Sequence, residues 1–103
     1  MKSDATDLTA VSRKAEEAAS LMRVLSHSAR LRVVCELVGG ERSAGDLVRA
    51  SGLSQSALSQ HLARLREDGV VTTRRDSQTI YYGIADKRTL RLLKFLQELY
   101  CGK

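Results

Sequence analysis

Apolar residues recur at helical spacing in five stretches of this chain, and two shorter stretches have the composition of β-strands. The helices are expected over residues 13–24, 28–38, 43–50, 54–68 and 86–101, and the strands over residues 70–73 and 79–82. Ser28 and Ser43 are placed to cap the second and third helical stretches. Glycines follow the second, third and fourth stretches, where helices commonly end. The pattern predicts a mainly α-helical fold with one small β-hairpin (α+β).

The fourth helical stretch has two faces of different character. Leu58, Leu62 and Leu65 predict a buried face, and Ser54 is placed to cap the first turn. The opposite face carries side chains that can hydrogen-bond base edges or phosphates, namely Gln55, Ser56, Ser59, Gln60 and Arg64. A merely solvated helix more often mixes Glu with Lys, so this face favours binding to double-stranded DNA.

A tight turn at Ser51 and Gly52 precedes this helix, and the hairpin follows it, which is the arrangement of a winged helix-turn-helix. His61 lies between the polar face and buried Leu62, and we expect it to pack or to contact a phosphate rather than to bind a ligand. The loop between the strands is basic, so its arginines are expected to contact phosphates. The wing residues predicted to contact DNA are Arg74, Arg75, Gln78 and Thr79.

A longer pattern joins these segments. It comprises Leu25-Ser26-His27-Ser28-Ala29-Arg30-Leu31, Ser54-Gln55-Ser56, Ser59-Gln60-His61-Leu62, Leu65, Gly69-Val70-Val71 and Tyr81-Tyr82. The pattern covers roughly residues 15–101 and resembles the ArsR/SmtB family of small bacterial repressors. The resemblance implies a transcriptional repressor that binds an inverted-repeat operator as a homodimer through its first and last helices.

The bulk properties agree with this expectation. The chain has 103 residues and a formal charge of +5, which favours a polyanionic partner. Residues 1–12 are polar and aperiodic, so we expect a flexible N-terminal segment followed by one DNA-binding and dimerisation domain over residues 13–103. No apolar run is long enough for a membrane span, and the N-terminus does not resemble a signal peptide. A cytoplasmic protein without a membrane partner is therefore expected.

Two cysteines are the candidates for regulation. Cys35 is on the inward face of the second helix, where a small buried hydrophobe is the simplest interpretation, whereas Cys101 ends the last helix. A dimer-forming terminal helix would pass over the second helix, and a bridge becomes possible if the two Cα atoms come within about 7 Å. This placement resembles the BigR/SqrR branch of dithiol sensors. That resemblance implies a redox-sensing pair that releases DNA when it reacts with reactive sulfur species such as persulfide.

Other interpretations of the cysteines remain open from the residues alone. They could be inert thiols in a repressor or anti-repressor, or, less favoured, part of a metal-responsive repressor. A tight metal site needs three or four ligands, but residues 41–47 contain no cysteine pair and the final helix contains no histidine. No phosphate-binding glycine loop or nucleophile elbow is present either. We therefore expect no metal, no other cofactor and no enzymatic activity.

Overall fold

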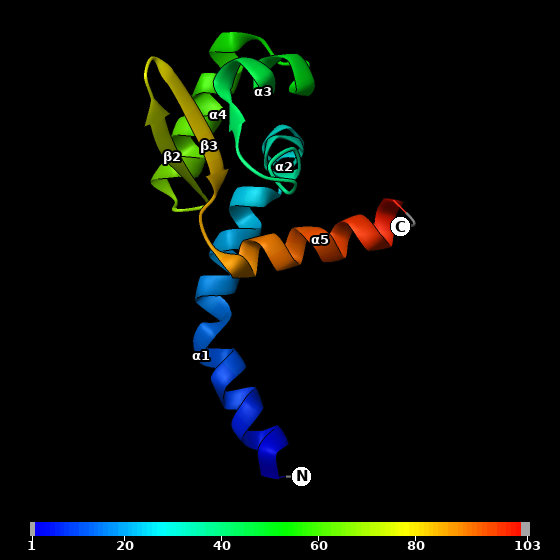
Figure 1. Cartoon of the computed structure of the whole chain (residues 1–103). Helices are drawn as coiled ribbons and strands as arrows, with labels where there is room; N and C mark the ends of the chain where they lie inside the picture. Colours follow the sequence, from blue (N-terminus) through cyan, green and yellow to red (C-terminus); the bar gives the residue numbers. More distant parts are fainter. Residues whose placement is uncertain (1, 102–103) are drawn as a thin grey trace.

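The computed structural model describes the backbone of residues 2–101 and the side chains of Ser12 and residues 14–100. Within this part, the helices are α1 (Lys2–Leu25), α2 (Ser28–Cys35), α3 (Ala44–Ser51), α4 (Gln55–Glu67) and α5 (Lys87–Cys101). The strands are β1 (Arg42–Ser43), β2 (Val71–Asp76) and β3 (Thr79–Ile84). Figure 1 shows α2, α3, α4 and the sheet gathered together, with α1 and α5 extending away in different directions. The predicted winged helix-turn-helix is confirmed.

The hairpin strands run longer than the sequence predicted. β2 and β3 pair over six residues each and close through a two-residue turn at Ser77 and Gln78. Ser77 has a φ of 60°, the left-handed conformation that such tight hairpin turns require. Arg74, Arg75 and Asp76 therefore belong to the strand, and the loop expected over residues 74–78 was wrong.

A third strand was not predicted. β1 pairs antiparallel with β3, Arg42 opposite Tyr82 and Ser43 opposite Tyr81, so the sheet order is β1-β3-β2. Two residues are too short to carry an alternating pattern, and only the pairing with β3 makes them a strand. This pairing fixes the base of the wing to the start of α3.

Three helix boundaries also differ from expectation. α2 ends at Cys35 rather than at Val38, because residues 36–39 form turns that do not continue the helix. α1 begins at Lys2 rather than near Arg13, because neither glycine nor proline interrupts the early sequence. The N-cap of α2 is His27, not Ser28, and its Nδ1 accepts a hydrogen bond from the Ala29 N–H at 3.2 Å. The flexibility expected for residues 1–12 stays a prediction, and the side chain of Cys101 lies outside the described residues.

One hydrophobic core joins the helices to the sheet. Its buried residues come from every helix, from the turn after α2, and from the start of β2 and the residue before it, namely Leu25, Val33, Val34, Leu37, Leu47, Leu58, Leu62, Leu65, Val70, Val71 and Leu93. The three leucines predicted for the inward face of α4 are all among them. The core therefore fixes α4 by one face and leaves its opposite face for other contacts.

α5 is apolar on two sides, and only one of them is used within the protomer. Leu93 is fully buried and Thr89 is 1% exposed, whereas Phe95, Leu99 and Tyr100 remain 55%, 59% and 83% exposed. Met22 on α1 is also 60% exposed. Among the described helices, none combines the length and apolar character that a bilayer crossing requires.

Candidate nucleic-acid interface and cysteine site

The polar face of α4 is held outward by the packing and capping of the helix. The Ala57 N–H donates to Ser54 Oγ at 3.1 Å, so the predicted N-cap is confirmed. Gly52 ends α3 with a φ of 72°, which lets the chain turn into α4. All five predicted polar residues are exposed on one side of the helix, namely Gln55, Ser56, Ser59, Gln60 and Arg64. This exposed side of the helix can therefore meet a flat or grooved partner.

Arg32, which the sequence analysis did not single out, stabilises the turn before α4. Arg32 of α2 donates from Nη1 to the Ser51 carbonyl at 3.3 Å. Ser51 Oγ in turn accepts a hydrogen bond from the Leu53 N–H at 3.2 Å. Because these bonds join α2 to the helix-turn-helix turn, a movement of α2 changes the support of α4. The contact spans 19 residues of sequence, so no local pattern could indicate it.

The two wing arginines have different roles in the structure. Arg74 Nε donates to both carboxylate oxygens of Glu41 at 3.1 and 3.2 Å, and its Nη2 donates to Oε1 at 2.8 Å. Its guanidinium also lies over the Tyr81 ring, 4.7 Å from the centroid. Arg75 is exposed, and successive strand residues point to opposite faces. Arg75 is therefore the arginine of this pair that is free for phosphate.

Glu41 is a second functional residue that the sequence analysis missed. Its hydrogen bonds from Arg74 hold the pKa of this carboxyl below its usual value, so it stays ionised. The contact ties the wing to the loop between α2 and β1. Both side chains are largely exposed, so the pair sets geometry rather than contributing much stability.

His61 and Arg64 also have neighbours within the protomer. The His61 ring lies 4.9 Å from the ring of His27, and partial burial lowers its pKa, helped by the nearby charges of His27 and Arg30. Arg64 Nε donates to Asp68 Oδ2 at 2.9 Å. The packing role expected for His61 agrees with its position between α4 and the cap of α2.

Cys35 ends α2 at the side of α5. It is half-buried against the core and lines a hollow of about 210 Å³ with Leu31, Leu96, Gln97 and Tyr100. Gln97 and Cys101 are four residues apart on α5 and so lie on the same side of that helix. The backbone thus brings the end of α5 to the side of α2 that carries Cys35.

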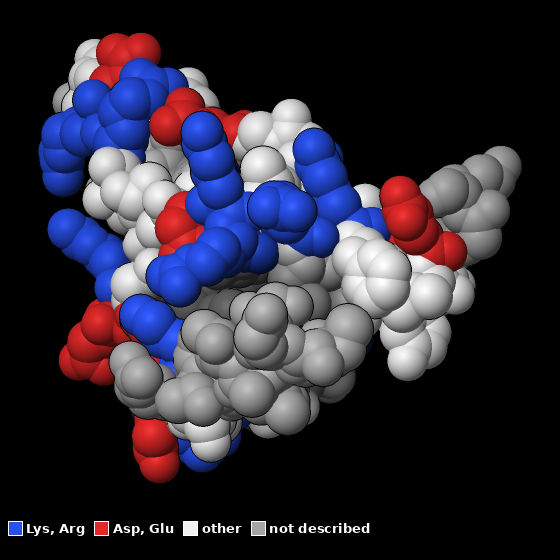
Figure 2. Space-filling model, turned by 90° about the horizontal axis from the view of Figure 1, so that it is seen from below, with Lys and Arg blue, Asp and Glu red and all other residues white. Residues whose placement is uncertain are grey.

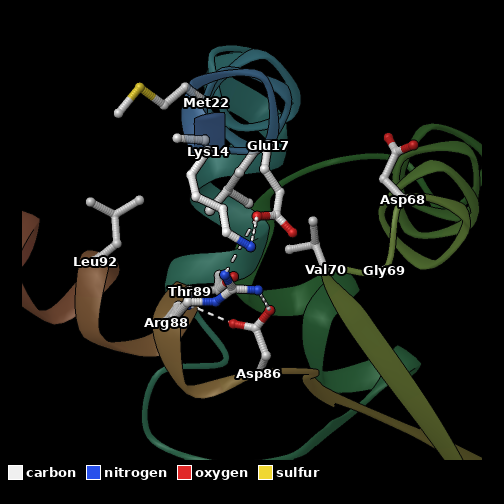
Figure 3. Close-up of a pocket in the computed structure, with 12 residues that line it drawn as sticks. Lys14, Glu17, Met22, Asp68, Gly69, Val70, Asp86, Arg88, Thr89 and Leu92 are labelled. Carbon is white, nitrogen blue, oxygen red and sulfur yellow. Dashed lines mark hydrogen bonds and ion pairs between the residues drawn. The ribbon is translucent and has the colours of Figure 1, made fainter. Parts of the chain in front are cut away.

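Charged side chains link the first and last helices. Figure 3 shows a hollow of about 390 Å³ where Glu17 of α1 faces Lys14 and Arg88, at 3.6 and 4.0 Å. Arg88 Nη2 also lies 4.0 Å from Asp86 Oδ2. Asp86 Oδ1 accepts a hydrogen bond from the Thr89 N–H at 2.8 Å and so caps the start of α5. These contacts orient the start of α5 against α1.

Charges of both signs lie on the face of the molecule that is seen from below in Figure 2. Figure 2 shows groups of Lys and Arg side chains with acidic residues among them, and a largely uncharged surface toward the end of α5. Within the described residues, no group of three or more His, Cys, Asp or Glu side chains is arranged to hold a metal ion.

Comparison with known proteins identifies the family. The family model described as bacterial regulatory protein, arsR family, matches residues 27–73, from the cap of α2 into β2. The HTH-type transcriptional regulator YgaV of Escherichia coli K12 is 42% identical over 97 residues, which cover 93% of this chain and 98% of the relative. The chain belongs to the ArsR family of bacterial regulatory proteins. Membership places it among DNA-binding transcriptional regulators.

Other proteins similar to this chain include an activator, a repressor and a homodimeric DNA-binding domain. The transcriptional activator HlyU of Vibrio cholerae is 37% identical over 101 residues, 98% of this chain and 94% of the relative. The transcriptional repressor BigR of Xylella fastidiosa superposes with a TM-score of 0.86 at 39% identity, covering 92% and 97% of the two chains. The homodimeric winged helix-turn-helix domain of Mb0332 from Mycobacterium bovis gives 0.75 at 27% identity, covering 85% and 82%.

Proposed function

We propose that this ArsR-family regulator is a homodimeric repressor that leaves its operator when Cys35 and Cys101 are oxidised to a bridge. The observation that carries the DNA-binding part is the exposed polar face of α4, opposite three buried leucines. The similarity to the BigR repressor supports the direction of regulation. The chain is also similar to the transcriptional activator HlyU, so the experiment below must distinguish repression from activation.

In this proposal α4 enters the major groove. The residues assigned to base edges are Gln55, Ser56, Ser59 and Gln60, with His61 at the margin. Arg64 and Arg75 would contact phosphates, and Gln78 and Thr79 would act at or beside the tip of the wing. Arg74 is assigned mainly to holding the wing through Glu41, although its exposed edge can still approach a phosphate.

The dimer is proposed to form through α1 and α5. Phe95, Leu99 and Tyr100 leave an apolar stripe on α5 that the protomer does not cover, and Met22 adds to it on α1. The homodimeric relative supports the same assembly. Two-fold symmetry would place the two α4 helices at half-sites about one helical turn apart.

The proposed switch is a dithiol reaction. A cysteine thiolate attacks the sulfane sulfur of a persulfide, RSSH, and a thiol RSH leaves, so that a cysteine persulfide forms. The thiolate of the second cysteine then attacks the inner Sγ of this persulfide. The Sγ–Sγ bond forms, the bond to the outer sulfur breaks, and the outer sulfur leaves as H₂S with the two thiol protons. The protein is oxidised to a disulfide and the sulfane sulfur is reduced to H₂S. A second equivalent of RSSH would give a trisulfide with one further RSH.

The bridge would act through α2, because the middle and the C-terminal end of this helix are linked to the turn before α4 and to the wing. The C-terminal end carries Cys35 and leads through a short turn to Glu41, which holds the wing. Arg32 in the middle of α2 holds the turn before α4. Fixing the end of α5 to Cys35 would shift these supports and misalign the half-sites.

In vitro selection from a random duplex library should yield an inverted repeat, and a reporter under that sequence should become more active when the protein is deleted. Lower activity on deletion would make the protein an activator. A selection that enriches no sequence would contradict the proposal that α4 recognises specific bases.

For the switch, Cys35→Ser, Cys101→Ser and the double variant should bind the selected operator like the unmodified protein. None should release it after treatment with glutathione persulfide. Mass spectrometry should find the bridge within one chain, with a monomer-sized product on a denaturing non-reducing gel. Release from the double serine variant, or a bridge between chains, would contradict the proposed switch.

A further inference from the structure

We infer that a hollow beside α4 binds one phosphate group through the three arginines that line it. The hollow has a volume of about 220 Å³ and lies where the end of α1, the start of α2 and the end of α4 meet. This volume is the liquid share of about seven waters, enough for one phosphate group and a few waters. Its lining residues are Ser20, Arg23, Val24, Arg30, Arg64 and Asp68. The inference rests on the proposed function and adds Arg23 and Arg30 to its contacts.

The charges of the hollow are not balanced within the protomer. Asp68 is the only acidic side chain of the lining, and it is already bonded to Arg64 at 2.9 Å. Over the part of the chain that the structure describes, Arg23 and Arg30 form no ion pair. An anion placed between them would relieve the repulsion of these like charges.

A buried donor also points to a missing acceptor. Arg30 Nε is buried and has no hydrogen-bond partner among the described residues. An unsatisfied buried donor is costly, more so on a charged group. Guanidinium groups bind phosphate oxygens with paired hydrogen bonds, so a phosphate group suits both the charge and the donors of this site.

The position of the hollow favours a phosphate of the DNA backbone. Arg64 is one helical turn beyond Gln60, so one wall of the hollow continues from the reading face of α4. A DNA strand at the edge of the major groove would then present a phosphate to the three arginines. Free inorganic phosphate has the same chemistry and is the other possible source.

The test uses Arg23→Ala, because Arg23 is exposed and its loss should not disturb the core. Arg91→Ala removes an exposed arginine from α5 and is the matched control. Affinity for a fluorescein-labelled mixed-sequence duplex is measured by anisotropy over a range of NaCl concentrations. The slope of log K against log salt should fall by about 0.9 for each lost phosphate contact in Arg23→Ala and stay unchanged in the control.

A second measurement identifies the source of the phosphate. Without DNA, the melting temperatures of the three proteins are compared in sodium phosphate and sodium chloride at equal ionic strength. A fall in the salt slope assigns the site to DNA. An unchanged slope, with phosphate stabilising the unmodified protein and the control but not Arg23→Ala, assigns it to free phosphate. If Arg23→Ala matches the control in both measurements, the inference is wrong.

Failure of the proposed function gives a different result. An unmodified protein that binds no duplex at low salt contradicts DNA binding itself, while the melting comparison still reports on the hollow. Arg30→Gln provides a second variant, with circular dichroism to show that it folds. Whichever readout changes in Arg23→Ala, the salt slope or the stabilisation by phosphate, should change in the same way in Arg30→Gln.

Discussion

Replacing Phe95 with alanine should weaken the dimer without unfolding the protomer. A phenylalanine side chain covers about 150–250 Å² when fully buried, and Phe95 is 55% exposed in the protomer. About 100 Å² therefore remains for a partner to cover, which is worth about 2.5 kcal/mol at roughly 25 cal/mol per Å². Alanine retains part of this contact, so the loss is about 2 kcal/mol per protomer and about 4 kcal/mol per symmetric dimer. The dissociation constant should rise about a thousandfold.

Sedimentation equilibrium across a range of protein concentrations measures this change directly. Leu93→Ala is the matched control on the same helix, because Leu93 is fully buried within the protomer. It should lower the free energy of unfolding by about 2–5 kcal/mol through the cavity it leaves. A well-folded monomer for the unmodified protein at micromolar concentration would refute the reasoning, as would a Phe95→Ala dimer as tight as the original.

Three further changes test the DNA-reading surface and its surroundings. Gln60→Ala should weaken binding to the selected operator by about 1–3 kcal/mol while leaving binding to mixed-sequence duplex nearly unchanged, with exposed Glu67→Ala as control in the same anisotropy assay. Arg75→Ala should weaken both kinds of duplex and lower the salt slope by about 0.9, and an unchanged slope would remove Arg75 from the interface. Because burial lowers the pKa of His61 in the folded protein, the unfolded chain binds its proton first, so stability should fall as pH drops below about 6.5. His61→Gln should reduce this loss in urea unfolding curves, and an identical pH profile would contradict the assignment.

The features that the sequence predicted are those with a short-range physical cause. The spacing of Leu58, Leu62 and Leu65 determines which face of α4 is buried, and a serine before each of α3 and α4 accepts a hydrogen bond from the first turn. Both Ser43 and Ser54 cap as expected, at 3.1 Å. His27 took the cap of α2 from Ser28, because an imidazole nitrogen can accept the same bond. Capping preferences read from the sequence distinguish these two neighbouring N-cap candidates, His27 and Ser28, only weakly.

The features that were missed depend on pairs of residues far apart in the chain. Arg74 and Glu41 are separated by 33 positions, and neither residue alone indicates a contact. Leu93 and Phe95 looked alike in the apolar pattern of α5, yet one is core and the other is exposed. Only the packing of α5 on the protomer distinguishes them. The same packing makes Leu93 a poor choice for testing the dimer, since a charge there would disrupt the core first.

In the proposed switch, one short helix would couple the thiol reaction to DNA binding, because α2 carries Cys35 and also contacts the turn before α4. α2 has eight residues, with Cys35 at its end and Arg32 one turn before it. Such a rigid segment passes on a displacement at Cys35 rather than absorbing it. The bond from Arg32 to the Ser51 carbonyl is long at 3.3 Å, and a net hydrogen bond contributes about 0.5–1.5 kcal/mol. Losing it in both protomers would supply about 1–3 kcal/mol, the range in which coupling changes affinity about 5–150-fold. The proposed switch would therefore require no large rearrangement of the core, only a small shift of α2, which supports the turn before α4.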